Sequence, residues 1–152
     1  MNSLKFVQRL SLALSLAVVA LAVTPIAAAA SADNPLAAER WKTRPIVVVV
    51  PTADDALLQR IQATLRETAS REAFIDREMV LFTVVAGEGR RDGKPLGSRR
   101  TRAMLQALDI PDDGRPRFLL IGKDGGVKMT EGADVKLDAV FAEIDRMPMR
   151  QR

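Results

Sequence analysis

The chain has 152 residues and a formal net charge of +4, from 23 basic and 19 acidic side chains. This length fits a single domain, and so small a basic excess argues against a dedicated nucleic-acid binder. The sequence contains no cysteine and no histidine, which excludes disulfides, thiolate chemistry and both Ser-His-Asp and Cys-His catalysis within the chain. We therefore predict no catalytic residue, no metal site and no cofactor.

The N-terminus has the order of segments that is typical of a secretory signal peptide. Lys5 and Arg9 give it a positive start, residues 10–23 are largely apolar and uncharged, and small residues follow up to Ala30-Ser31-Ala32. The apolar stretch is shorter than the roughly 20 residues of a membrane-spanning helix. We expect cleavage after Ala32, a periplasmic or secreted domain over 33–152, and no stable membrane span after cleavage.

The first half of the expected domain predicts two strands around a helix. Five consecutive β-branched residues over 46–50 indicate a strand that is buried on both faces, and Pro51 ends it because proline has no N–H for a ladder. Thr52 is expected to cap the next helix, and apolar residues at helical spacing predict one amphipathic helix over 54–73. A second apolar strand is predicted over 79–85.

The second half predicts a hairpin between two helices. Residues 86–98 are rich in glycine and are expected to form a loop. A short helix is expected over 99–108, and strands over 117–122 and 127–130. Asp124-Gly125 predicts a type I′ turn between these two strands. Asp134 is expected to cap a last helix over 135–147 whose core face consists of Leu137, Val140, Phe141, Ile144 and Met147.

The order of elements, β-α-β-α-β-β-α with right-handed crossovers, predicts an α/β fold with a mixed four-stranded sheet and helices on both faces. This order resembles the thioredoxin fold, and residues 115–127 look like its third strand, hairpin and fourth strand. The resemblance implies a cis peptide bond before Pro116. It implies no redox function, because Asp54-Asp55-Ala56-Leu57 stands where thioredoxins carry Cys-x-x-Cys.

The chain as a whole resembles a bacterial family of secreted thioredoxin-like domains of unknown function, which is related to a domain in animal sushi-repeat extracellular proteins. Three stretches carry this likeness: Asn34-Pro35-Leu36 with Arg40-Trp41, the hairpin over 122–128, and residues 144–150. Because these motifs look structural, the resemblance implies the fold and leaves the function open.

The first candidate binding site lies where thioredoxins have their active site. Two acids open the first helix, and the residue before the proline of this fold can hydrogen-bond an extended peptide. The acids also fit a plain structural role, since they complement the helix dipole, and the proline also fits a rigid turn into the strand. The residues of this site are Asp54, Asp55, Arg115 and Pro116.

The second candidate site is the densest basic region of the sequence, which Glu88 and Asp92 dilute. It would meet anionic lipid, glycan or an acidic partner, or it is a solvated loop. No aromatic residue is interleaved for base stacking, so we expect no nucleic acid as a partner. Trp41 is expected to pack the N-terminal segment onto the domain, and the alternative is a ligand platform. The basic residues are Arg90, Arg91, Lys94, Arg99, Arg100 and Arg102.

These observations favour a non-enzymatic binding or adaptor module for an envelope protein or peptide. Two alternatives stay open. One is a carboxylate-dependent hydrolase, which needs two converging acids, one of them with a raised pKa. The other is an electrostatic binder of anionic envelope components through residues 90–102. The sequence determines neither the oligomeric state nor the ligand.

Overall fold

The computed structural model describes residues 33–111 and 113–148, and the predicted signal peptide lies outside them. The strands are β1 (Arg44–Val50), β2 (Met79–Val85), β3 (Glu88–Arg91), β4 (Lys94–Pro95), β5 (Arg117–Ile121) and β6 (Val127–Glu131). The helices are η1 (Pro35–Glu39), α2 (Ala56–Arg66), α3 (Thr68–Asp76), α4 (Ser98–Ala107) and α5 (Leu137–Asp145), of which η1 is a short 3-10 helix.

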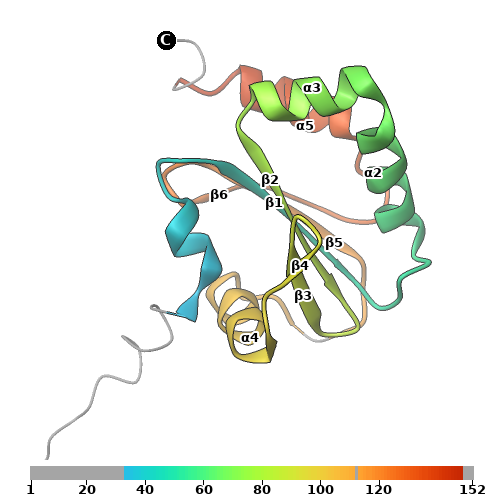
Figure 1. Cartoon of the computed structure of the whole chain (residues 1–152), viewed down its shortest axis with the longest axis vertical. Helices are drawn as coiled ribbons and strands as arrows, with labels where there is room; N and C mark the ends of the chain where they lie inside the picture. Colours follow the sequence, from blue (N-terminus) through green and yellow to red (C-terminus); the bar gives the residue numbers. More distant parts are fainter. Residues whose placement is uncertain (1–32, 112, 149–152) are drawn as a thin grey trace, which may run out of the picture.

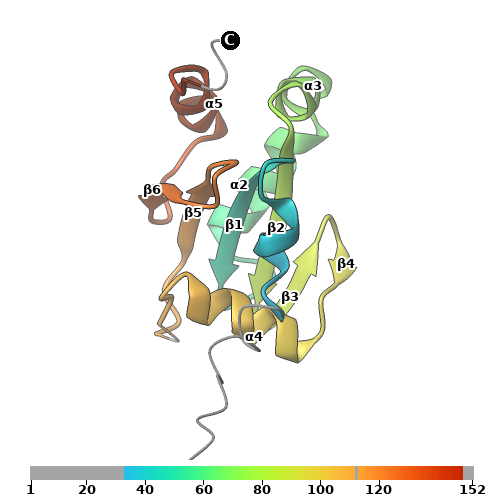
Figure 2. The same cartoon turned by 90° about the vertical axis from the view of Figure 1, so that its left-hand side faces the viewer.

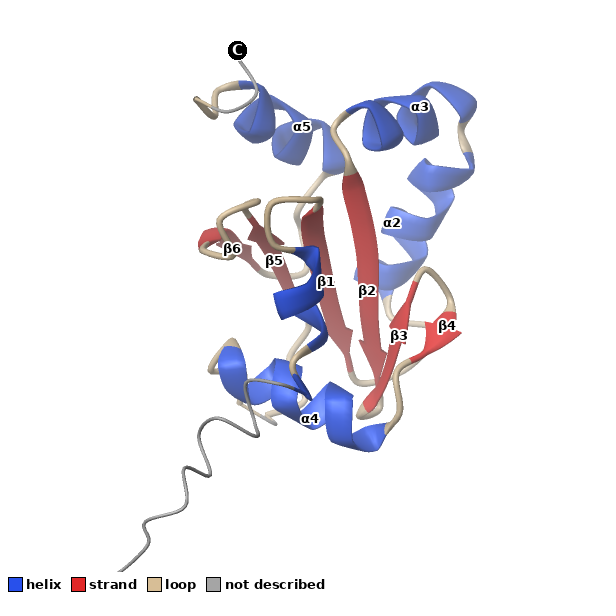
Figure 3. Ribbon diagram, turned by 60° about the vertical axis from the view of Figure 1, so that its left-hand side comes forward, coloured by secondary structure: helices blue, strands red, loops and turns tan. Residues whose placement is uncertain are grey.

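The strands form one mixed sheet in the order β4-β3-β2-β1-β5-β6 (Figures 1 and 3). β1 and β2 run parallel, and all other neighbouring strands run antiparallel. The predicted α/β class and mixed sheet are confirmed, and β1, β2, β5 and β6 are the four strands that the sequence predicts.

The helices cover both faces of the sheet (Figure 2). Side chains of α2, α3 and α5, such as Leu57, Phe74 and Val140, pack on the face of β1 that carries Val48. On the other face, Leu36 of η1 and Met104 of α4 pack beside Val47. β1 is thus buried from both sides, as its run of β-branched residues predicts.

The segment over 86–98, predicted as a loop, contains β3 and β4. Ala86-Gly87 and Asp92-Gly93 each have two consecutive positive φ values, the geometry of two-residue type I′ turns. The first turn folds β3 back onto β2, and the second folds β4 onto β3. The sheet therefore has six strands rather than four, because backbone turns extend it where no apolar run signals a strand.

The predicted type I′ turn at Asp124-Gly125 is wrong. Of these two residues only Gly125 has a positive φ, +84°. The Gly125 N–H donates to the Gly122 carbonyl at 2.9 Å, and the Gly122 N–H donates to the Gly126 carbonyl at 2.8 Å. These bonds define a three-residue loop, a type I turn followed by a left-handed glycine.

The single helix predicted over 54–73 is two helices, α2 and α3, separated at Glu67, whose backbone is extended with φ −70° and ψ 131°. The break has a packing reason. In one straight helix, Phe74 would lie about 180° around the axis from Leu65, at about 100° per residue. The change of direction at Glu67 instead brings Phe74 onto the same core as Ile61.

Two predicted helix caps are also wrong. Asp55, not Thr52, is the N-cap of α2, and its carboxylate accepts the Leu57 N–H at 2.9 Å. Lys136, not Asp134, is the N-cap of α5, without a side-chain cap bond. The predicted core face of α5 is confirmed, since Leu137, Val140, Phe141 and Ile144 are buried and Met147 packs partly against them.

The N-terminal segment packs through Leu36 and not through Trp41. Asn34 caps η1 by accepting the Leu36 N–H at 3.0 Å, and Leu36 is 7% exposed. Trp41 is 64% exposed, so the prediction that it anchors this segment is wrong. Between residues 33 and 148, position 112 aside, no helix has the length and apolarity needed to cross a membrane.

Candidate functional site

A cleft of about 250 Å³ opens at the carboxyl ends of the parallel strands β1 and β2. From β1 the chain passes to α2 on one face of the sheet, and from β2, by way of β3 and β4, to α4 on the other. Ligands of open α/β sheets bind at such a switch point. The cleft is lined by Val49, Val50, Pro51, Val84, Ala86, Gly87, Leu105, Ile110, Pro111, Gly114 and Arg115.

Of the sequence-predicted residues, Arg115 reaches this cleft, and among the described residues of the lining it is the one that carries a charge. Its side chain is 81% exposed, and its Nε lies 3.9 Å from the Asp113 carboxylate. The Arg115–Pro116 peptide bond is trans, since the described backbone contains no cis bond. The cis bond implied by the thioredoxin resemblance is therefore wrong, and Pro116 is a half-buried residue outside the lining.

Asp113 holds the turn that presents Arg115. Its carboxylate accepts the Arg115 backbone N–H at 3.1 Å and pairs with the guanidinium of Arg117. The Arg115 N–H, followed by the hydrogen bond and charge of Arg117, holds the pKa of Asp113 below its usual value. Asp113 therefore fixes the rim of the cleft, and with its N–H occupied Arg115 has only its side chain and carbonyl to offer a ligand.

The structure does not bring Asp54 and Asp55 to the cleft. The Asp55 carboxylate is occupied as the cap of α2, and Asp54 is exposed. A hydrogen bond from the Thr52 hydroxyl holds the pKa of Asp54 below its usual value. Both acids thus have the local role that acids take at the start of a helix.

The predicted basic group is spread over β3, β4 and α4, and two of its members are neutralised. Arg91 pairs with Glu39 at 2.7 Å and with Asp92 at 3.0 Å, and Arg99 pairs with Asp33 at 2.6 Å. The remaining members are exposed and form no ion pair with a described residue: Arg90, Lys94, Arg100 and Arg102.

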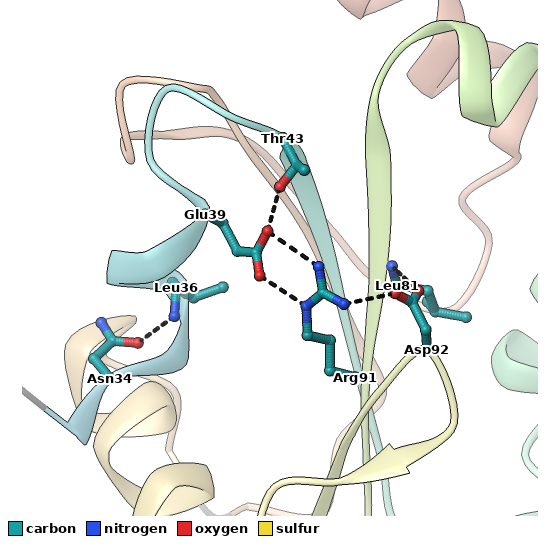
Figure 4. Close-up of polar contacts among 7 residues, drawn as sticks. All are labelled: Asn34, Leu36, Glu39, Thr43, Leu81, Arg91 and Asp92. Carbon is teal, nitrogen blue, oxygen red and sulfur yellow. Dashed lines mark hydrogen bonds and ion pairs between the residues drawn. The ribbon is translucent and has the colours of Figure 1, made fainter.

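The Glu39 carboxylate is a buried polar centre that sequence reasoning missed (Figure 4). Its side chain is 10% exposed. Arg91 donates to both of its oxygens, at 2.7 and 3.3 Å, and the Thr43 hydroxyl donates at 2.7 Å. Burial raises the pKa of Glu39, but these hydrogen bonds and the charge of Arg91 outweigh burial and hold the pKa below its usual value.

This centre ties three parts of the chain together. Glu39 ends η1, Thr43 precedes β1 and Arg91 ends β3. Asp92 extends the network by accepting from Arg91 at 3.0 Å and from the Leu81 N–H at 3.1 Å. No sequence signal links Glu39 to Arg91, because 52 positions separate them. The network is structural and lies apart from the cleft lining.

The three stretches that carry the family resemblance meet at the amino end of β1, opposite the end at which the cleft lies. The guanidinium of Arg40 donates to the Asp124 carbonyl, and the Trp41 N–H donates to the Lys123 carbonyl. Lys123 and Asp124 in turn line a cavity with Met147 and Pro148. No group of three or more acids, histidines or cysteines is arranged for a metal ion within 33–111 and 113–148.

Comparison with solved structures identifies the fold. The chain aligns with the reduced 2-Cys peroxiredoxin of Plasmodium vivax with a TM-score of 0.53 and 15% identity, over 76% of this chain and 83% of that chain. The likeness shows a thioredoxin-like fold, here in a chain without cysteine. At this identity it shows the fold alone.

The sequence comparison then gives the family. Residues 35–152 match the family described as "Domain of unknown function (DUF4174)", and the chain belongs to this family. The predicted membership in a family of unknown function with a thioredoxin-like fold is thereby confirmed. No curated protein matches the sequence significantly. Export, bacterial origin and the relation to sushi-repeat proteins stay predictions.

Proposed function

We propose that this chain is a non-redox binding module that takes a protein or peptide segment into the cleft at the carboxyl ends of β1 and β2. The observation that supports this proposal is the lining itself, in which the side chains of the described residues are apolar apart from one exposed cation, Arg115. An apolar side chain of the partner would fill the cleft, and a neighbouring carboxylate would pair with Arg115. With the predicted signal peptide, the partner would be an envelope protein or peptide.

The same lining gives no support to the hydrolase alternative. Among the residues that the structure describes, it contains no carboxylate, hydroxyl or thiol that would act as acid, base or nucleophile. Clear downward shifts are found in the carboxyl pKa values of Glu39, Asp54, Glu78, Asp113 and Asp124. A general acid needs a carboxyl pKa that is raised.

Replacing Arg115 with glutamate is expected to weaken peptide binding at least about tenfold, since a favourable charge contact becomes a repulsive one. Peptides that bind would first be selected from a random display library on the purified chain. Their affinities for the wild type and for the R115E variant would then be compared by titration calorimetry.

The matched control is R71E, which makes the same change of charge at an exposed residue of α3, outside the cleft lining and outside the basic group. R115E is expected to keep the melting temperature of the wild type, because Arg115 is exposed. Equal affinity of R115E and wild type for every selected peptide would overturn the assignment to this cleft.

A second candidate function, the binding of anionic envelope components, is favoured by four exposed cations without ion pairs: Arg90, Lys94, Arg100 and Arg102. Arg100 also stands in the first turn of α4, which contains no acid. There it is close to the positive end of the helix dipole, an unfavourable position for a cation.

Replacing Arg100 and Arg102 with glutamate is therefore expected to raise the melting temperature slightly while it abolishes retention on a heparin column. The wild-type chain should elute at moderate salt, because exposed charges are screened beyond a Debye length of about 10 Å at 0.1 M. Elution of the double variant at the same salt concentration as the wild type would count against this second function.

A further inference from the structure

The loop between η1 and β1 exposes three consecutive side chains, Arg40, Trp41 and Lys42. Trp41 is the only tryptophan of the chain, and it is 64% exposed. Its φ of +64° lies in the left-handed region, which a bulky side chain rarely adopts. The exposed ring adds little to the stability of the fold, and the strain in its backbone opposes folding, so both indicate a role other than stability.

Contacts with the β5–β6 hairpin hold this loop in place. The Trp41 N–H donates to the Lys123 carbonyl at 2.6 Å. The Arg40 guanidinium donates twice to the Asp124 carbonyl, at 3.1 and 2.9 Å. Arg40 also lies against Gly125, where a Cβ would be 2.9 Å from its Nε. Trp41 is thus presented on a rigid support, which lowers the entropy lost when a partner binds.

A cavity of about 350 Å³ lies beside this loop, between the hairpin and the end of α5. Lys123 and Asp124, the residues whose carbonyls hold Trp41 and Arg40, are part of its wall. Met147 and Pro148 supply apolar surface on the opposite side. The cavity therefore has room and surface for an apolar side chain of a partner.

The charged residues that line the cavity are in ion pairs, whereas two cations of the adjoining loop are not. Arg44 and Lys123 pair with Glu78, Lys128 pairs with Asp124, and Glu143 of the lining pairs with Arg146. Arg40 and Lys42, on either side of Trp41, have no carboxylate of a described residue within ion-pair distance. The loop is thus positively charged around an exposed aromatic ring.

We propose that Arg40, Trp41 and Lys42, together with this cavity, form a docking surface for an acidic segment of a partner protein. The ring of Trp41 covers an apolar part of the segment, and carboxylates pair with Arg40 and Lys42. An apolar side chain of the segment enters the cavity. One aromatic residue on a rigid loop offers far less apolar area than the amphipathic surfaces that bind membranes, which favours a protein segment over a lipid surface.

This surface is separate from the cleft of the proposed function. Arg44 begins β1 and lines the cavity, whereas Val50 ends β1 and lines the cleft. A strand of this length spans roughly 20 Å. The two sites therefore lie at opposite ends of the central strand, and a variant at one site serves as a control for the other.

The test is a selection of random displayed peptides on the wild-type chain with counter-selection on W41G. Glycine adopts a positive φ without strain. We therefore expect the melting temperature of W41G to stay close to that of the wild type, with a small loss at most, because part of the Trp41 ring is buried. Enriched peptides should combine acidic and apolar residues and shift the emission of Trp41 to shorter wavelength. W41G and K42E should each bind them at least about tenfold more weakly, whereas R115E should bind them unchanged.

Several results would overturn the proposal: no enrichment of peptides, enrichment of peptides without acidic residues, or affinities of W41G and K42E that equal the affinity of the wild type. Loss of binding in R115E alone would assign the peptides to the cleft instead. A shift of Trp41 emission with phosphatidylglycerol vesicles but with no selected peptide would identify a lipid surface. Self-association that W41G abolishes, measured by sedimentation velocity, would identify a second copy as the occupant.

Discussion

Replacing Glu39 with glutamine is expected to lower the free energy of unfolding by about 2 kcal/mol. The Glu39 side chain is 10% exposed and accepts three hydrogen bonds, two from Arg91 and one from Thr43. The amide of glutamine removes the negative charge and turns one acceptor into a donor that faces Arg91. Because the Arg91 side chain is 40% exposed and keeps Asp92 as a partner, the loss should be smaller than for a fully buried pair.

The free energy of unfolding that E39Q loses relative to the wild type should become smaller as the pH falls. The pKa of Glu39 is lowered in the folded chain, from an unfolded value of about 4.3. Its stabilisation is therefore complete above about pH 4.3 and disappears as the pH falls through the folded-state pKa. Chemical denaturation at neutral and at acidic pH should show the difference between wild type and E39Q shrinking in acid.

The matched control is E131Q, which makes the same change at an exposed carboxylate on β6. E131Q should melt close to the wild type at neutral pH. A difference between wild type and E39Q that stays constant from neutral pH to below about pH 3 would contradict the role of the ionised pair.

Replacing Gly89 with alanine is expected to lower the free energy of unfolding by about 2–3 kcal/mol. A Cβ at Gly89 would lie 2.2 Å from Oγ1 and 2.9 Å from Cγ2 of Thr101. Thr101 is 2% exposed, and its hydroxyl donates to the Gly97 carbonyl at 2.9 Å, so it has no room to move. The new methyl group would push α4 away from β3.

A double-mutant cycle tests this steric account. T101A removes the two nearest atoms, and in the double variant G89A/T101A most of the loss caused by G89A should disappear, with a coupling of about 1–2 kcal/mol. G132A is the control, because nothing lies within 4 Å of a Cβ there and no positive φ opposes it. Strictly additive effects of G89A and T101A would contradict the close approach of α4 to β3.

The central strands are predictable from the sequence because their side chains are buried on both faces. Continuous apolar runs mark β1, β2 and β5, and a short run that is rich in β-branched residues is typical of a strand buried on both faces. β3 contains Glu88, Arg90 and Arg91 and carries no such pattern. The one local signal for the β3–β4 turn is Asp92-Gly93, the pair that is typical of a type I′ turn.

The candidate site is predictable in part. The resemblance to the thioredoxin fold indicates Arg115, because the residue before the proline of this fold can bind an extended peptide. Since β5 runs antiparallel to β1, the start of β5 lies at the carboxyl end of β1, beside the cleft. The separation of Asp54 and Asp55 from that cleft depends on the direction in which α2 leaves β1. The partners of Glu39 and Trp41 come from distant parts of the chain. Contacts of this kind cannot be predicted from the spacing of neighbouring residues in the sequence.

The two edge strands of the sheet, β4 and β6, differ in their ability to pair with a strand of another chain. β4 is a two-residue strand that ends in Pro95, and proline lacks the N–H that an incoming strand would need. β6, at the opposite edge, is a five-residue strand with mostly exposed side chains, and no other strand of the described residues pairs with its outer side. Linear polymerisation by strand addition requires that both edge strands pair with another copy of the chain. Association of copies through β6 alone would therefore stop at a dimer.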